Sequence, residues 1–285
     1  MDKVQFVKKI MSHIQPGWRA NAIACPLIGA LKLAKPRGEV AAQNITIAFP
    51  EKNEQERRDI LMDSYESMVW TGIEFFASQK DPTLVKKWVV EVEGEKYLSE
   101  ARENGKGVII IAPHLGNWEL AASWLAQLHG PVTAIVRHSD DPFQRELIAA
   151  LRESSGLLTL DKNAPMTRGV GILRRNELFG ILPDQHGGSE GIVVPFFGVE
   201  TSTVIGPAVF AVLTGAPIIS IQLIRLAPFR FKIVLDAPLE WKKGPDRDTT
   251  IRDLTIIVNR QIEKMVRRAP GQWLWQHRRF KELDD

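Results

Sequence analysis

The feature that most constrains this chain is an alternation, from about residue 88 onward, of short β-branched runs with longer helical segments. Such alternation is typical of a parallel sheet whose strands are connected by helices. We therefore expect an α/β fold with a mostly parallel central sheet flanked by helices on both faces, and a helical N-terminal extension. The expected strands are 108–112, 132–136, 157–160, 178–182, 192–197, 218–224 and 231–235, and the expected helices are 51–79, 117–128, 142–152, 166–175 and 248–268.

Residues 1–37 are expected to form a helical segment of their own, ahead of a single α/β domain over 38–285. The run 20–31 has no charged residue and has basic residues on both sides. It contains Pro26 and Gly29, and it is shorter than the roughly 20 apolar residues that span a bilayer. This pattern favours a segment lying at a membrane interface, with a spanning helix and an ordinary packed helix as alternatives.

A second uncharged stretch, residues 201–224, is long enough to span a bilayer. Gly206-Pro207 and the Gly-Ala-Pro run at 215–217 interrupt it. These breaks predict a helix, a turn and then a buried strand.

The composition excludes several classes of protein. With 44% apolar and 25% charged residues, the 285-residue chain has the proportions of a globular protein. The single cysteine, Cys25, forms no internal disulfide and offers no thiolate metal site. Six histidines without metal-ligand spacing predict no metal, and a net charge of +3 does not indicate a nucleic-acid partner.

The segment Gly107–Leu120 carries the most chemical information. It reads as an apolar strand, a turn containing Pro113 and Gly116, and a helix. His114 therefore follows the carboxyl end of a strand, where open α/β sheets place their ligands. Glu119 falls in the first helical turn, near enough to contact the imidazole. A carboxylate bonded to one ring nitrogen leaves the other free to act as a base.

No enzyme nucleophile accompanies this pair, because the chain has no G-x-S-x-G elbow. A base without such a nucleophile indicates direct attack by a hydroxyl of the substrate. The alternative is that His114 is an ordinary loop histidine and Glu119 a solvated helix residue.

Several segments in order resemble one family of enzymes. His114–Glu119 (H-L-G-N-W-E) resembles the His-x4-acid (HX4E) motif of glycerolipid and lipid A acyltransferases. The blocks at 44–50, 136–142, 183–198 and 270–281 are similar to those of the late, lauroyl or myristoyl, acyltransferases of lipid A biosynthesis. The resemblance covers about residues 40–281. Two departures are a short, interrupted N-terminal apolar segment and Gly271 in place of the family's usual acidic residue.

The resemblance implies acyl transfer from an acyl carrier protein or coenzyme A thioester to a hydroxyl of an anionic glycolipid, a lipid A precursor. It implies no cofactor beyond that donor. His114 is expected to act as general base and Glu119 to orient it. Arg137 is expected to stabilise the oxyanion or bind an acceptor phosphate, with an exposed ion-pair partner as the alternative. Asp184 is expected to support the site by bonding to Arg137 or to backbone donors. The expected substrate-binding residues are Asn117, Arg152, Gln185 and Arg168.

The same resemblance implies a protein at the cytoplasmic face of the inner membrane, peripheral or monotopic. An apolar groove is expected to receive the acyl tail. The alternatives are an acyltransferase acting on another glycolipid, such as a phosphatidylinositol mannoside, or on an aminolipid; a non-catalytic module that binds lipid or docks the carrier protein; and a hydrolase that passes the acyl group to water.

Overall fold

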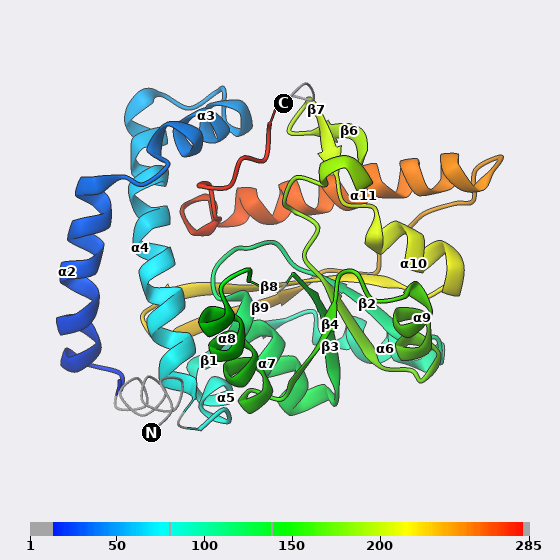
Figure 1. The fold of residues 1–285 in the computed structure, drawn as a ribbon, viewed down its shortest axis with the longest axis horizontal. Helices are drawn as coiled ribbons and strands as arrows, with labels where there is room; N and C mark the ends of the chain where they lie inside the picture. The colour runs from blue at the N-terminus through cyan, green and yellow to red at the C-terminus, as the bar shows by residue number, and fades with distance from the viewer. Residues whose placement is uncertain (1–13, 80, 138, 282–285) are drawn as a thin grey trace.

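A seven-stranded sheet forms the centre of the protein, whose computed structural model describes residues 14–79, 81–137 and 139–281. The strand order is β1-β9-β8-β2-β5-β3-β4 (Figure 1). The strands are β1 (Val89–Glu93), β2 (Val108–Ile111), β3 (Val132–Val136), β4 (Leu157–Asp161), β5 (Leu178–Ile181), β8 (Ile218–Ala227) and β9 (Arg230–Leu235). All neighbours are parallel except β8 and β9, which form an antiparallel hairpin. The expected mostly parallel α/β sheet is confirmed.

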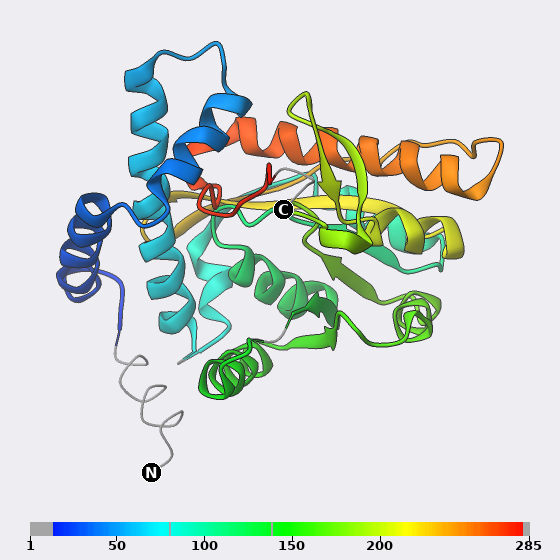
Figure 2. The same cartoon turned by 45° about the horizontal axis from the view of Figure 1, so that its top comes forward.

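Helices cover both faces of this sheet. They are α5 (Leu84–Trp88), α6 (Glu95–Glu103), α7 (Trp118–His129), α8 (Pro142–Ser154), α9 (Met166–Arg174), α10 (Gly206–Thr214) and α11 (Arg247–Arg268). Short 3₁₀ turns lie at Gly188–Glu190 and Pro270–Gln272. Figure 2 shows α11 and α7 on opposite sides of the sheet.

Alternation along β2 explains the two covered faces. Ile109 and Ile111 belong to the apolar cluster that includes α9, α10 and α11, whereas Val108 and Ile110 belong to the cluster that includes α6 and α7. Successive side chains of a strand point to opposite faces, so an all-apolar strand needs a helical layer on each side.

The elements that differ from expectation lie at the edges. β1 and α6 were not expected, because β1 reads V-V-E-V-E and keeps four of its five residues exposed. The segment 192–203 forms a separate antiparallel hairpin of β6 (Ile192–Phe196) and β7 (Val199–Thr203) rather than a strand of the main sheet.

Three helices precede the sheet: α2 (Trp18–Ala34) in the expected N-terminal segment, and α3 (Gly38–Ala48) and α4 (Glu54–Ser78) at the start of the expected α/β domain. The asparagine side chain at position 53 accepts a hydrogen bond from the Glu56 backbone while the Glu56 side chain accepts one from the Asn53 backbone, a capping box that fixes the start of α4. In Figure 1, α2 lies alongside α4.

Pro26 and Gly29 do not break the expected helical segment, because α2 continues through both as one helix of 17 residues. Pro26 has no backbone N–H to donate, and it lies in the third turn of a helix whose outer face is exposed. Within the three described ranges, no helix combines the length and the apolar character needed to cross a bilayer. Residues 1–13 of the expected interface segment lie outside the described part.

Candidate active site

Two adjacent parallel strands bring a histidine and an aspartate together. β2 and β5 pair in register, with Ile111 opposite Ile181. His114 and Asp184 each lie three residues beyond these paired positions. Both side chains therefore meet at the carboxyl edge of the sheet, the edge at which α/β folds place their ligands.

The Asp184 carboxylate holds His114 at two points. The Nδ1 atom of His114 lies 2.8 Å from Oδ1 of Asp184, and the backbone N–H of His114 donates to Oδ2 at 2.7 Å. The indole N–H of Trp273 also donates to Oδ2, at 2.8 Å. An ionised carboxylate only accepts hydrogen bonds, so it selects the tautomer with the proton on Nδ1. Nε2 then carries the lone pair of a base.

The electrostatics of the pair shift the two pKa values in opposite directions, that of His114 upward and that of Asp184 downward. Burial opposes charge on both groups, since the side chain of Asp184 is 1% exposed and that of His114 is 21% exposed. The charge and hydrogen bond of Asp184 outweigh burial and raise the pKa of His114 above its ordinary value. Burial likewise acts to raise the pKa of Asp184, but its bonds to His114 and Trp273 lower it overall.

Glu119 does not make the contact that the sequence spacing predicts. The carboxylate bonded to His114 Nδ1 is that of Asp184, and Glu119 instead forms a two-point ion pair with Arg152. Arg152 donates from its Nε at 3.1 Å and from a terminal nitrogen at 2.6 Å. Glu119 still acts on the imidazole through space, because its negative charge contributes to the raised pKa of His114.

Among the described residues, Asp184 hydrogen-bonds to His114, and no such bond is present for Arg137, Gln185 or Arg168. Asp184 bonds to a backbone donor, as expected, but not to Arg137, whose exposed guanidinium lies 3.4 Å from Asp140. Gln185 is half-buried directly after Asp184, and Arg168 is exposed on α9.

Asn117 is fully buried and positions the turn after His114. Its side-chain oxygen caps α7 by accepting from the backbone of Leu120, and its amide donates to Glu74 at 3.0 Å and to the Thr71 carbonyl at 3.2 Å. This environment is that of a structural group rather than of the substrate-binding residue expected from the resemblance.

A buried ion pair between α4 and β8 lies next to the same turn. Arg225 on β8 donates to both oxygens of Glu74 on α4, at 2.8 and 2.7 Å, and the two side chains are 7% and 0% exposed. Thr71 beside them donates to the carbonyl of Gly116. Gly116 has φ of +60°, and a Cβ there would lie 1.9 Å from the Leu223 carbonyl oxygen, so the turn requires glycine.

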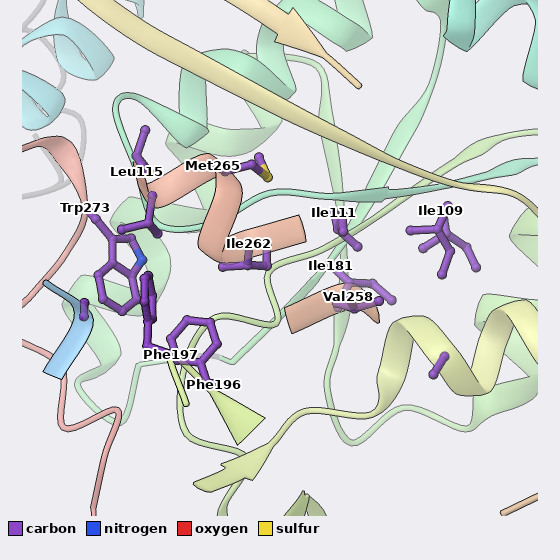
Figure 3. Close-up of a cluster of buried hydrophobic side chains, with 14 of the residues drawn as sticks. Ile109, Ile111, Leu115, Ile181, Phe196, Phe197, Val258, Ile262, Met265 and Trp273 are labelled. Carbon is purple, nitrogen blue, oxygen red and sulfur yellow. The ribbon is translucent and has the colours of Figure 1, made fainter. Parts of the chain in front are cut away.

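The C-terminal segment closes over the site. The backbone N–H of Leu274 donates to the carbonyl of His114 at 3.0 Å, and Leu115 pairs with Trp273 in an isolated bridge. Figure 3 shows the Trp273 ring beside Leu115 and the rings of Phe196 and Phe197. The sequence analysis did not predict the bond from Trp273 to Asp184. The signal was its place in the terminal block of the resemblance.

Two further basic residues of this segment lie near the site, Arg279 buried and His277 half-buried. Partial burial lowers the pKa of His277 to about 4, so its ring is neutral at neutral pH. Burial also lowers the pKa of Arg279, to about 10. Arg279 nevertheless keeps its charge at neutral pH and donates to the Ser202 carbonyl and the Thr203 hydroxyl, which joins the C-terminal segment to β7.

Comparison with known proteins identifies the family. The profile of bacterial lipid A biosynthesis acyltransferases matches residues 17–282. The chain belongs to this family. It is therefore an acyltransferase, as the sequence resemblance implies.

Individual relatives align over different shares of the chain. The lipid A biosynthesis palmitoleoyltransferase of Escherichia coli K12 is 29% identical over 273 residues, which cover 93% of this chain and 83% of the relative. The lauroyltransferase of the same organism is 27% identical over 88% of this chain and 81% of the relative. A phosphatidylinositol mannoside acyltransferase of Mycobacterium tuberculosis is 30% identical, but over 45% of this chain and 42% of its own length.

The departure at Gly271 has a local explanation. A Cβ at this position would lie 2.6 Å from the Cβ of Asp63 on α4. The side chain of Asp63 therefore fills the space into which a side chain at 271 would extend.

Proposed function

We propose that this acyltransferase moves a fatty acyl chain from an acyl carrier protein or coenzyme A thioester to a hydroxyl of a lipid A precursor, with His114 as general base. The observation that carries the proposal is the His114–Asp184 pair. Asp184 occupies Nδ1, and no residue in the three described ranges hydrogen-bonds to Nε2.

The proposed reaction needs one base that also returns the proton. Nε2 of His114 removes the proton of the acceptor hydroxyl as its oxygen attacks the thioester carbonyl carbon. The carbon–sulfur bond then breaks, the thiolate leaves with the proton from the imidazolium, and an ester remains. Asp184 stabilises the imidazolium between these steps, the role that we expected of Glu119. No metal or other cofactor takes part in this scheme.

Extent of alignment favours lipid A as the acceptor class, since the lipid A relatives align over about nine-tenths of the chain and the mannoside relative over less than half. We expect the acyl chain to bind in an apolar groove, where each buried methylene contributes about 0.8 kcal/mol to the binding free energy. That groove stays a prediction.

The test is acyl transfer by the purified protein, followed by mass spectrometry of the product. Labelled donors on acyl carrier protein and on coenzyme A are offered with lipid A precursors, phosphatidylinositol mannosides and aminolipids. We expect an ester on the lipid A precursor and a loss of about 10²- to 10⁴-fold in rate for His114→Ala. The matched control is His129→Ala, because His129 pairs with Glu95 at the far end of α7. Equal rates for His114→Ala and wild type would refute the mechanism.

We further propose that α2 holds the protein at the cytoplasmic face of the inner membrane. Trp18, Leu27 and Leu33 are 75, 49 and 86% exposed on this helix, with Arg19 and Lys35 near its ends. Exposed apolar side chains next to basic ones suit an anionic lipid surface.

Sedimentation with anionic and neutral vesicles tests the membrane proposal. We expect wild type to bind anionic vesicles more strongly, and Leu27→Gln to weaken that binding. Leu226→Gln is the control, because Leu226 lies on β8 and is exposed to the same extent, 47 against 49%. Equal effects of the two substitutions would exclude α2 as the membrane contact.

A further inference from the structure

A cavity of about 340 Å³ lies between the end of β3 and α8, next to the Glu119–Arg152 pair. Its volume is within the range of small-molecule sites. Three arginines line it, Arg137, Arg145 and Arg152, whereas Asp140 is the one acidic residue among its described lining residues. Such a lining repels cations and attracts an anion.

Each arginine is held in a way that leaves donors for a ligand. Arg145 donates from Nε to the carbonyl of Ser139 at 3.0 Å, which uses one of its five N–H groups. Arg152 is fixed by its two bonds to Glu119. Arg137 pairs with Asp140 at 3.4 Å, and both side chains are largely exposed, at 73 and 94%. Exposed pairs of this kind contribute little to stability, so an incoming anion displaces this one at small cost.

Charged side chains at the cavity interact electrostatically with the imidazole of His114. The charges of Glu119 and Arg152 both act on the pKa of His114.

We propose that this cavity binds a phosphate group of a substrate, by forked hydrogen bonds from Arg137 and Arg145 with Arg152 at the base. Planar guanidinium groups match phosphate oxygens in pairs, which makes arginine the usual residue for this task. This inference rests on the proposed function, in which two substrates contain phosphate. They are the glycolipid acceptor and the phosphopantetheine arm of the donor. Sequence reasoning named Arg137 and Arg152 but missed Arg145.

The experiment compares phosphate-bearing and phosphate-free forms of each substrate. The acceptor is offered as a phosphorylated glycolipid and as its dephosphorylated form, and the donor as acyl-phosphopantetheine and as acyl-pantetheine. We expect wild type to prefer the phosphate-bearing form of one substrate in KM. The double variant Arg137→Gln, Arg145→Gln is expected to reduce that preference by about 10- to 100-fold, the effect of removing charge-assisted hydrogen bonds. The substrate whose preference falls is the one that the cavity binds.

Arg175→Gln is the control, because Arg175 is an exposed arginine paired with Glu177 away from the cavity. Calorimetric titration with inorganic phosphate gives a readout that does not depend on turnover: wild type and Arg175→Gln are expected to bind, and the double variant is not. If no acyl transfer occurs but phosphate binding depends on Arg137 and Arg145, the proposed function fails and the site stands. Equal preference and equal phosphate binding in wild type and the double variant would overturn the site.

Discussion

Trp273→Phe separates the hydrogen bond on Asp184 from the packing around it. The indole N–H donates to a buried, ionised carboxylate at 2.8 Å. A hydrogen bond to a charged group contributes about 1.5–3 kcal/mol, against about 0.5–1.5 for a neutral one. The excess of about 1–1.5 kcal/mol corresponds to roughly one pH unit if it passes to the imidazolium.

The direction of the effect follows from the bonds to Asp184. The indole bond lowers the pKa of Asp184, so without it the carboxylate interacts more strongly with the imidazolium and raises the pKa of His114 further. His114 acts as a base only when neutral, and the rate falls as pH drops through its pKa. We therefore expect the acidic limb of kcat/KM to move to higher pH by up to about one unit.

Trp275→Phe is the matched control. Trp275 is also fully buried in the C-terminal segment, but its indole N–H donates to the neutral carbonyl of Pro270 at 2.7 Å. Both substitutions remove the same atoms from the core, so both are expected to lower the urea midpoint. The reasoning is refuted if the two variants share one pH profile, or if the limb of Trp273→Phe moves to lower pH.

Further predictions concern the groups around the site. Arg225→Met leaves Glu74 buried without its ion-pair partner, and we expect the free energy of unfolding to fall by about 3–5 kcal/mol. Adding Glu74→Gln to this variant is expected to restore part of that loss. Equal urea midpoints for the single and double variants would contradict this prediction. His277 has a pKa of about 4 in the folded protein against an ordinary value of 6.5. Between these pH values the unfolded chain binds a proton at His277 that the folded chain does not bind. Stability is therefore lost as pH falls from about 6.5 to about 4, and we expect His277→Gln to flatten that loss in chemical denaturation; an unchanged slope would show that other groups cause it.

Periodicity and strand-end chemistry were enough to predict most of the sheet. Residues 132–136 form a strand with the expected bounds, and His114 and Asp184 follow strands as expected. Their contact was not predictable, because it depends on strand order. β2 and β5 are neighbours although β3 and β4 lie between them in sequence. Glu119, by contrast, lies close to His114 in sequence but bonds to Arg152.

The buried charges escaped prediction for a related reason. A single charged residue such as Glu74 or Arg225 is typical of a solvent-exposed face, and these two partners lie 151 positions apart in the sequence. Only the fold shows that both are removed from water and must pair. Pro26 shows that a strong local signal does not decide alone, because α2 continues through this proline.

The most direct test of the account is a titration of the His114 imidazole by nuclear magnetic resonance in wild type, Asp184→Asn and Glu119→Gln. We expect a pKa above 6.5 in wild type, because the Asp184 charge and hydrogen bond outweigh burial. In Asp184→Asn the imidazole stays buried but loses the negative charge that favours its protonation, so its pKa is expected to fall below 6.5. A smaller decrease in this pKa is expected in Glu119→Gln. A larger decrease in Glu119→Gln, or no change in Asp184→Asn, would contradict the assignment of Asp184 as the carboxylate that orients the base.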